Sequence, residues 1–229
     1  MKKIAISQSN YIPWKGYFDF INEVDEFVLY DDVQYTKRDW RNRNRIKTPH
    51  GLKWLTIPVT ASRSMNINEV EIAEENWNEN HWKTIRHLYS QAEHFDLYSD
   101  VIEHLYENAN QKKLSEINYH FLTGINELLG ISTPLTWSTD YESEGNKSER
   151  LLTICKEAGA DVYVSGPAAK DYLDTDLFDK EGIKVEWMNY AGYKEYSQVY
   201  GKFEHSVSII DLLFNTGKRA KDFMKSFKN

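Results

Sequence analysis

The sequence contains a single cysteine, Cys155, so an internal disulfide is excluded. This residue lies among aliphatic residues at helical spacing in RLLTICKEAG, which is typical of a buried thiol rather than a nucleophile. Long apolar runs are also lacking, since no window approaches the roughly 18 residues that a membrane span requires. The N-terminal MKKIAISQSN has too short an apolar run for a signal peptide. We therefore expect a cytoplasmic protein that does not enter a membrane.

Motifs of metal and hydrolase chemistry are absent as well. The seven histidines are scattered without the spacing of a zinc site, so we expect no metal. There is no Gly-x-Ser-x-Gly elbow, and the spacing of a phosphate-binding Walker loop does not occur. The formal net charge of -7 argues against general binding to nucleic acid or to a membrane surface. A local basic site remains compatible with this charge.

What the sequence does contain is an alternation of short apolar strands and amphipathic helices. The N-terminal part of the chain predicts a strand, a helix and a second strand, followed by a third strand at 52–59. Another strand is expected at 67–73. Residues 77–130 carry apolar side chains at intervals of three and four, which predicts three helices. Strand and helix then alternate again up to the C-terminus. This order predicts an α/β fold with a mostly parallel, Rossmann-like sheet. We expect one domain over residues 1–229, in which 77–130 is a helical insert or lid.

In such a sheet, ligands bind beyond the carboxyl ends of the strands. The first predicted strand is followed by SQSNYIPWKGYF, in which amide side chains, aromatic rings and the glycine that opens the helix come together. Flat rings can stack on a sugar or a base, and a helix N-terminus attracts phosphate. The competing interpretation is a Pro-Gly turn with aromatics at the edge of the core. We predict that this segment binds substrate through Gln8, Asn10, Tyr11, Trp14 and Gly16.

The second candidate is a basic run after the next strand, in an otherwise acidic chain. Arg41, Arg43 and Arg45 alternate with asparagines, so an extended chain would place the three guanidinium groups on one face. Such a row suits bidentate binding of phosphate or carboxylate. A solvated charged face is the alternative. The predicted ligand-binding residues of this run are Lys37, Arg38, Arg41, Asn42, Arg43, Asn44 and Arg45.

Acid or base candidates lie at the two ends of this basic run. Asp31 and Asp32 end the preceding strand, and because neighbours on a strand point to opposite faces, at most one should reach a given site. The other is expected to pair with the arginines that follow. His50 lies in the turn after the run. We predict Asp32 and His50 as the catalytic candidates, either of which could be the base.

A weaker third signal follows a later strand. In YVSGPAAKDYLD, Ser165 and Gly166 end the strand and Lys170 lies in the first turn of the helix that we expect to follow. This arrangement could hold an anion, so the three residues are added to the predicted substrate-binding set.

Three long motifs resemble the WbqC-like family of bacterial proteins. They are IAISQSNYIPWKGYFDFINEVDEFVLYDDVQYTKRDWRNRNRIKTPHGLKWLTIPV, YVSGPAAKDYLD and FEHSVSIIDLLFNTG, and the resemblance extends over nearly the entire chain. The family pattern commonly has a proline where this chain has Ser9. The opening also resembles class I nucleotidyltransferases, except that Gly16 is followed by Tyr17 where those enzymes have histidine.

The resemblance to the WbqC-like family implies a role in bacterial O-antigen or other surface-polysaccharide synthesis. The activity expected from it is transfer of an acyl or aminoacyl group to a nucleotide-linked amino sugar. The donor would be a carrier-linked or CoA-linked acyl group, and an acyl carrier protein is a possible partner. Two alternatives stay open. One is a nucleotidyltransferase that uses a sugar phosphate and a nucleoside triphosphate, and the other is a non-catalytic protein that binds a nucleotide sugar or a carrier.

Overall fold

The computed structural model describes residues 1–62, 64–142 and 145–227. Its centre is a sheet of five parallel strands, in the order β7-β2-β1-β8-β9. The strands are β1 (Lys3–Ser7), β2 (Glu26–Leu29), β7 (Leu135–Trp137), β8 (Val162–Ser165) and β9 (Lys184–Trp187). Counted along the chain, this is the order 3-2-1-4-5 of a Rossmann-type sheet. The predicted fold class is therefore confirmed.

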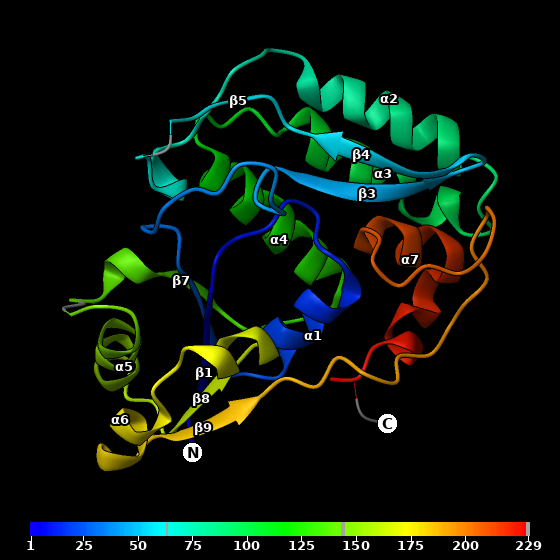
Figure 1. Ribbon diagram of the computed structural model, residues 1–229. Coiled ribbons are helices and arrows are strands. Elements are labelled where there is room, and N and C mark those ends of the chain that lie inside the picture. Colours follow the sequence, from blue (N-terminus) through cyan, green and yellow to red (C-terminus); the bar gives the residue numbers. More distant parts are fainter. Residues whose placement is uncertain (63, 143–144, 228–229) are drawn as a thin grey trace.

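Both faces of the sheet are covered, as side-chain alternation along each strand requires. Ile4 and Ile6 of β1 are buried with the apolar side of α5 (Ser148–Glu157) and α6 (Thr175–Lys180). Ala5, between them, belongs to a second cluster with α1 (Lys15–Asn22) and the remaining helices. Figure 1 shows α5 and α6 on one side of the strands and α1 on the other. Cys155 is buried in the first cluster, where burial raises the pKa of its thiol to about 12, as expected for a structural thiol.

The chain between β2 and β7 builds a second layer. Its hairpin consists of β3 (Arg43–Thr48) and β4 (Gly51–Thr56), which pair antiparallel. Three helices follow, α2 (Trp77–Tyr89), α3 (Phe95–Glu107) and α4 (Leu114–Leu129), and their presence confirms the predicted helical block. The C-terminal α7 (Ile209–Thr216) packs against α3 and β3 (Figure 1). Whether the three helices act as a lid stays a prediction.

Some predicted elements differ from the structure. The strand expected at 52–59 is β4, and it belongs to the hairpin rather than to the parallel sheet. At 67–73 only a two-residue strand forms, β6 (Glu71–Ile72), which pairs with β5 (Val59–Thr60). The helix expected after Ser165 is a 3-10 helix, Pro167–Asp171.

The C-terminal helix stops earlier than its apolar pattern suggests. Gly217 ends α7 with a φ of +58°, a conformation that favours glycine. A Cβ atom at this position would lie 2.6 Å from the ring of His94. The chain therefore turns beside α3 and continues as a 3-10 helix, Gly217–Phe223.

An irregular segment, residues 188–208, connects β9 to α7. It crosses the molecule beside α1 in Figure 1. Lys15 fixes part of it, because its Nζ donates to the carbonyl of Lys194 at 3.0 Å and lies 5.0 Å from the ring centroid of Tyr193. Burial lowers the pKa of Lys15 to about 8. This segment supplies Tyr190 and Ser206 to the cavities described below.

None of the helices in the described part of the chain combines the length and the apolar character that crossing a membrane requires.

Candidate functional site

The principal cleft lies at the point where the strand order reverses, between β1 and β8. In Rossmann-type sheets ligands bind at this point, beyond the carboxyl ends of the strands. The cleft has a volume of about 730 Å³. Ser7 and Gln8 line it from the end of β1, Ser165 and Gly166 line it from the end of β8, and Arg150 lines it from α5. We call this space the switch-point cleft.

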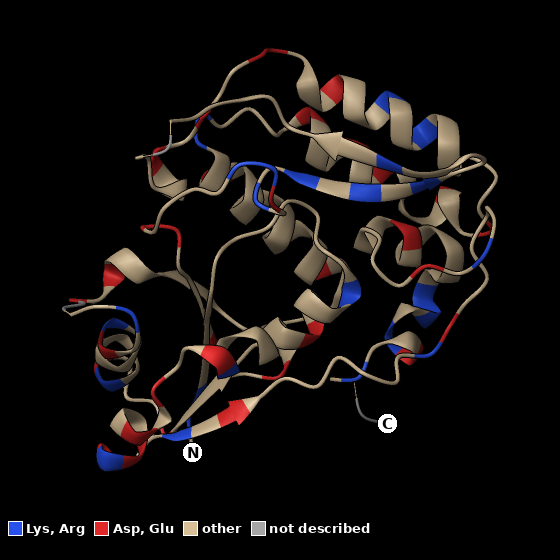
Figure 2. Ribbon diagram, in the orientation of Figure 1, with Lys and Arg blue, Asp and Glu red and all other residues tan. Residues whose placement is uncertain are grey.

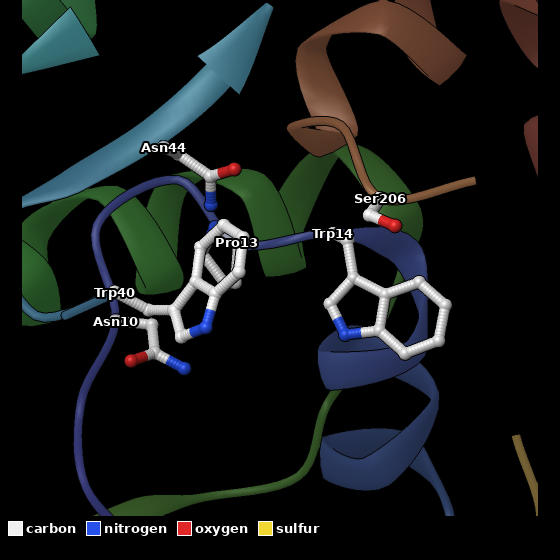
Figure 3. A pocket seen from close by; sticks show the side chains of 6 residues that line it. All are labelled: Asn10, Pro13, Trp14, Trp40, Asn44 and Ser206. Carbon is white, nitrogen blue, oxygen red and sulfur yellow. The ribbon is translucent and has the colours of Figure 1, made fainter. Parts of the chain in front are cut away.

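A smaller cavity of about 230 Å³ adjoins the switch-point cleft. Asn10, Trp14 and Trp40 line both spaces, so the two are adjacent. The other residues that line the smaller cavity are Pro13, Asn44 and Ser206. Figure 3 shows Trp14 and Trp40 on opposite sides of the opening. We call this cavity the indole pocket.

Hydrogen bonds hold the loop between β1 and α1 in place. Ser9 donates its backbone N–H and its hydroxyl to the two carboxylate oxygens of Asp31, at 2.8 and 2.6 Å. Asn118 of α4 donates to the Ser9 hydroxyl at 2.9 Å. A proline at position 9 has no backbone N–H and could not donate the backbone hydrogen bond to Asp31. Burial raises the pKa of the Asp31 carboxyl, while the bonds from Ser9 oppose that rise.

The same loop contains a strained residue. Ile12 is fully buried and has a φ of 35°, which is unusual for a β-branched side chain. Such a conformation costs roughly 1–3 kcal/mol and occurs preferentially at functional sites. Pro13 and Trp14 follow at once, so the strained residue sets the direction in which Trp14 enters the cleft.

Gly16 has a structural role beneath Trp14. A Cβ atom at position 16 would lie 2.2 Å from the Trp14 indole, so only glycine leaves room for the ring in this position. The indole also makes T-shaped contacts with Tyr190 and Tyr193, whose ring centroids lie 5.4 and 5.5 Å away. Gly16 is buried beneath the indole, and its predicted role in substrate binding stays a prediction.

Tyr11 also has a structural role. It is fully buried and lines neither cavity, and its predicted role in substrate binding stays a prediction. Its hydroxyl lies 2.9 Å from His81 Nδ1 and 2.7 Å from the Tyr106 hydroxyl. His81 Nε2 donates to the Thr56 carbonyl at 3.2 Å, which leaves Nδ1 as an acceptor. Tyr11 therefore donates to His81 and accepts from Tyr106. Burial lowers the pKa of His81 to about 4, so the ring is neutral.

The predicted row of three arginines divides into two parts. β3 begins only at Arg43, and Arg41, which precedes it, turns toward the β1–α1 loop. There its Nη1 donates to the carbonyls of Gln8 and Ser9, at 3.3 Å each, and to the side-chain oxygen of Asn10. Arg41 thus supports the cleft from behind the loop. Figure 2 shows basic residues concentrated on β3 and on the loop before it.

Arg43 and Arg45 lie side by side on the hairpin, stacked on indoles. The guanidinium carbon of Arg43 is 4.1 Å from the Trp54 ring centroid, and that of Arg45 is 5.4 Å from the Trp40 centroid. Arg43 also donates to the carbonyl of Arg38. Arg45 Nε donates to the carbonyl of Ser206 at 3.1 Å, which places this arginine at the rim of the indole pocket.

The asparagines between these arginines point into the protein. Asn42 and Asn44 are both buried. Asn42 donates to the Ile57 carbonyl at 2.9 Å and lines neither cavity, and its predicted contact with a ligand stays a prediction. Asn44 donates to the Tyr11 carbonyl at 3.1 Å and still borders the indole pocket. Lys37 and Arg38 are exposed on the loop before β3 and do not line either cavity.

Asp32 is bound to a residue of the cleft. Its carboxylate forms an ion pair with Arg150 and accepts a hydrogen bond from the Ser138 hydroxyl at 2.6 Å. One of the two aspartates was expected to pair with the arginines of the basic run. This expectation is wrong, because Asp32 pairs with Arg150 of α5 and Asp31 accepts from Ser9. His50 is exposed in the β3–β4 turn and lines neither cavity. The catalytic roles of both residues stay predictions.

From the third predicted segment, Ser165 and Gly166 line the switch-point cleft. Lys170 is exposed and lies 5.5 Å from the Trp187 ring centroid, so it is directed toward β9 instead. The cleft also receives residues that sequence reasoning did not single out, namely Tyr30, Trp40, Lys147, Arg150, Tyr190 and, in the indole pocket, Ser206. Only the strand order brings them together, and their sequence signals are weak.

The charged side chains at the two cavities belong to the switch-point cleft, whose electrostatics favour anions. Among the described residues that line them, the charged side chains are Lys147 and Arg150, and there is no aspartate, glutamate or histidine. Residues 1–62, 64–142 and 145–227 contain no group of three metal-ligating side chains of the His, Cys, Asp or Glu type. An anion with flat groups that stack on indole and phenol rings fits this environment.

Comparison with known proteins agrees with the motifs in the sequence. The model of the WbqC-like protein family matches residues 8–223. A protein of Mycobacterium tuberculosis that is described as uncharacterized protein Rv1507c is 49% identical over 227 residues, covering 98% of each chain. No solved structure matches. The chain therefore belongs to the WbqC-like protein family.

Proposed function

We propose that this protein binds a nucleotide-linked amino sugar in the switch-point cleft and transfers an acyl or aminoacyl group to it, as a step in surface-polysaccharide synthesis such as that of O-antigen. The observation that carries the binding half of the proposal is the cleft itself. It lies at the strand reversal of a Rossmann-type sheet, and its charged lining residues in the described chain are cationic. The transfer half rests on the family, whose members are associated with surface glycans.

The geometry favours one place for the diphosphate. Lys147 and Arg150 stand at the start of α5, opposite Gly166 at the end of β8. Their charges and the dipole of the helix would favour phosphate oxygens. The arginines of β3 are less suited to this task, because Arg43 and Arg45 are stacked on indoles and Arg41 is bonded to the β1–α1 loop. The sugar would then extend toward Trp14 and Trp40.

The transfer step requires a nucleophile, an activated acyl group and a base. The amine of the sugar attacks the carbonyl carbon of a thioester on CoA or on an acyl carrier protein. A C–N bond forms, the C–S bond breaks, the amine loses one proton to a base, and the thiolate takes up a proton. Asp32 is our candidate for the base because it contacts Arg150 of the cleft. When the diphosphate recruits Arg150, the carboxylate becomes available to the amine.

Binding is tested by calorimetric titration with UDP-, dTDP- and GDP-linked sugars. We expect one nucleotide class to bind and Lys147→Ala to weaken it by about tenfold, since hydrogen bonds to charged groups contribute roughly 1.5–3 kcal/mol. Lys156→Ala is the matched control, because Lys156 lies on the same helix and pairs with Glu181 on the outside. If no nucleotide sugar binds, or if both variants bind as the parent does, the proposed site is wrong.

Transfer is tested by mass spectrometry. The protein is incubated with a nucleotide-linked amino sugar and acyl-CoA or acyl carrier protein, and the product is expected to gain the mass of the acyl group.

One observation favours a second candidate, a non-catalytic nucleotide-sugar-binding protein: the described residues that line the cavities include no carboxylate or imidazole. Binding without product, for every donor, would favour that candidate.

A further inference from the structure

The indole pocket differs from the switch-point cleft in its chemistry. Its walls are the rings of Pro13, Trp14 and Trp40, and no charged side chain lines it among the described residues. Its volume of about 230 Å³ is less than a third of that of the cleft. The cations at its rim, Arg45 and Arg41, are bonded to the Ser206 carbonyl and to the Asn10 oxygen, so a charged group in this pocket would lack a dedicated counter-ion. The occupant should therefore be small and uncharged.

The hydrogen-bond donors of the pocket specify the occupant further. Arg41 can only donate, so the Asn10 atom that it contacts must be the side-chain oxygen. This fixes the orientation of the amide and leaves the Asn10 Nδ2 group without an acceptor in the described chain. Figure 3 shows the indole nitrogens of Trp14 and Trp40 on the lower edges of their rings, on the side of the opening where the Asn10 amide also lies. Neither indole N–H has an acceptor among the described residues.

The remaining polar groups of the pocket are already engaged. Asn44 donates to the Tyr11 carbonyl at 3.1 Å and accepts from the Arg45 N–H at 2.8 Å. The Ser206 hydroxyl donates to Glu204 at 2.9 Å. The pocket therefore offers three neutral N–H groups that lack protein acceptors and lie between apolar walls. None of the three is fully buried, so a ligand can reach them and supply the acceptor that the protein does not.

We propose that the indole pocket is the acyl subsite: it receives an uncharged acyl group whose carbonyl oxygen accepts hydrogen bonds from Asn10, Trp14 and Trp40. The methyl or longer alkyl part packs against the indoles and Pro13. The pocket shares Asn10, Trp14 and Trp40 with the switch-point cleft, so an acyl group placed there would lie beside a sugar held in the cleft. This assignment deepens the proposed function and rests on it for the origin of the acyl group.

The test follows the indole N–H signals by proton–nitrogen correlation NMR. The chain has seven tryptophans, and Trp14→Phe and Trp40→Phe identify two of the signals. N-acetylglucosamine should move both signals downfield, because an N–H proton is deshielded when it donates to a carbonyl. Glucosamine, which lacks the carbonyl, and acetate, which is charged, should leave both in place. The signal of Trp54, which contacts Trp40 but does not line the pocket, is the internal reference. Equal shifts with glucosamine or acetate, or no shift with N-acetylglucosamine, would overturn the proposal.

A variant removes the donor and keeps the size of the side chain. Asn10→Asp replaces the N–H group by a second acceptor, and its charge remains paired with Arg41. We expect N-acetylglucosamine to bind at least tenfold more weakly to it, since a site built to hydrogen-bond a group discriminates strongly when that bond is lost. Asn80→Asp makes the same change on the exposed face of α2 and should have no effect. Unchanged binding to Asn10→Asp would overturn the proposal.

This experiment separates the acyl subsite from the proposed function. If nucleotide sugars bind the cleft but acetylated and free amino sugars move the indole signals equally, the acyl subsite is wrong and the cleft assignment stands. If the indole signals respond to N-acetylglucosamine alone but no nucleotide sugar binds, the acyl subsite stands and the cleft assignment is wrong.

Discussion

Ser9 and Asp31 form a two-pronged contact in which the serine donates both its backbone N–H and its hydroxyl to the same carboxylate. Both residues are buried. The contact joins the loop after β1 to the chain at the end of β2. It therefore fixes the position of one loop relative to the other at this edge of the central sheet. Because Asn10 follows Ser9 directly, the contact also fixes the start of the segment that lines both cavities.

Ser9→Ala should destabilise the protein by about 1–3 kcal/mol, because it removes the Ser9 hydroxyl. This hydroxyl donates a hydrogen bond to Asp31 and accepts one from Asn118. Urea unfolding measures the change in the free energy of unfolding. Ser64→Ala, at an exposed position, is the control and should be neutral. A neutral Ser9→Ala would show that the loop does not depend on this contact.

The contact of Tyr11 with His81 predicts a pH effect on stability. The folded-state pKa of His81 is about 4, below the ordinary value of about 6.5. Between these values the unfolded chain binds the proton and the folded protein does not, so stability falls as the pH decreases from about 6.5 to about 4. The loss attributable to His81 is at most about 3 kcal/mol.

The variant His81→Gln isolates this effect, since it does not titrate and can still offer one donor and one acceptor. Unfolding free energies of parent and variant are measured from pH 4.5 to pH 7.5. We expect their difference to shrink as the pH falls, because only the parent loses this contribution. A difference that does not vary with pH would contradict the neutral, buried state of His81.

Gly16 permits a test in which helix propensity and packing oppose each other. In an exposed helix Gly→Ala stabilises by roughly 1 kcal/mol. At position 16, however, the new methyl group would meet the Trp14 indole, and we expect a net loss of about 1–3 kcal/mol. Because the ring must move, ligand binding to the cleft should weaken as well. Gly166→Ala is the control for stability, since a Cβ atom there has no neighbour within 4 Å. Stabilisation by Gly16→Ala would show that the indole moves freely.

Local pattern in the sequence was sufficient for most of the fold. The apolar spacing of residues 77–130 predicted three helices, and the apolar strands with helices between them predicted the parallel sheet. Cys155 was placed in the core on the same grounds. These features depend on periodicity over short distances, which a single sequence displays directly.

The site was less predictable because it depends on strand order. Asp32 and Arg150 are 118 positions apart, and they meet because the chain after β7 returns beside β1. Arg41 illustrates a second limit. The alternation that suggested a row of three arginines holds only within β3, which begins at Arg43, and no local signal marked that boundary. Burial of Tyr11 and Asn42 likewise follows from the second layer, which periodicity alone did not position.

Because Asp32 pairs with Arg150, it could act as the base or could only position Arg150. A variant of Asp32 distinguishes these two roles. Asp32→Asn keeps the shape of the side chain but cannot accept a proton at neutral pH. If Asp32 is the base, the rate of acyl transfer should fall by at least a hundredfold, because general base catalysis typically contributes 10² to 10⁴. Binding of the nucleotide sugar should be unchanged or tighter, since Arg150 is released toward the phosphates. Ser138→Ala, which removes the other partner of Asp32, should lower the rate only a few fold. If Asp32 only positions Arg150, the Asn variant should instead lose affinity, and its rate at saturating substrate should keep the pH profile of the parent.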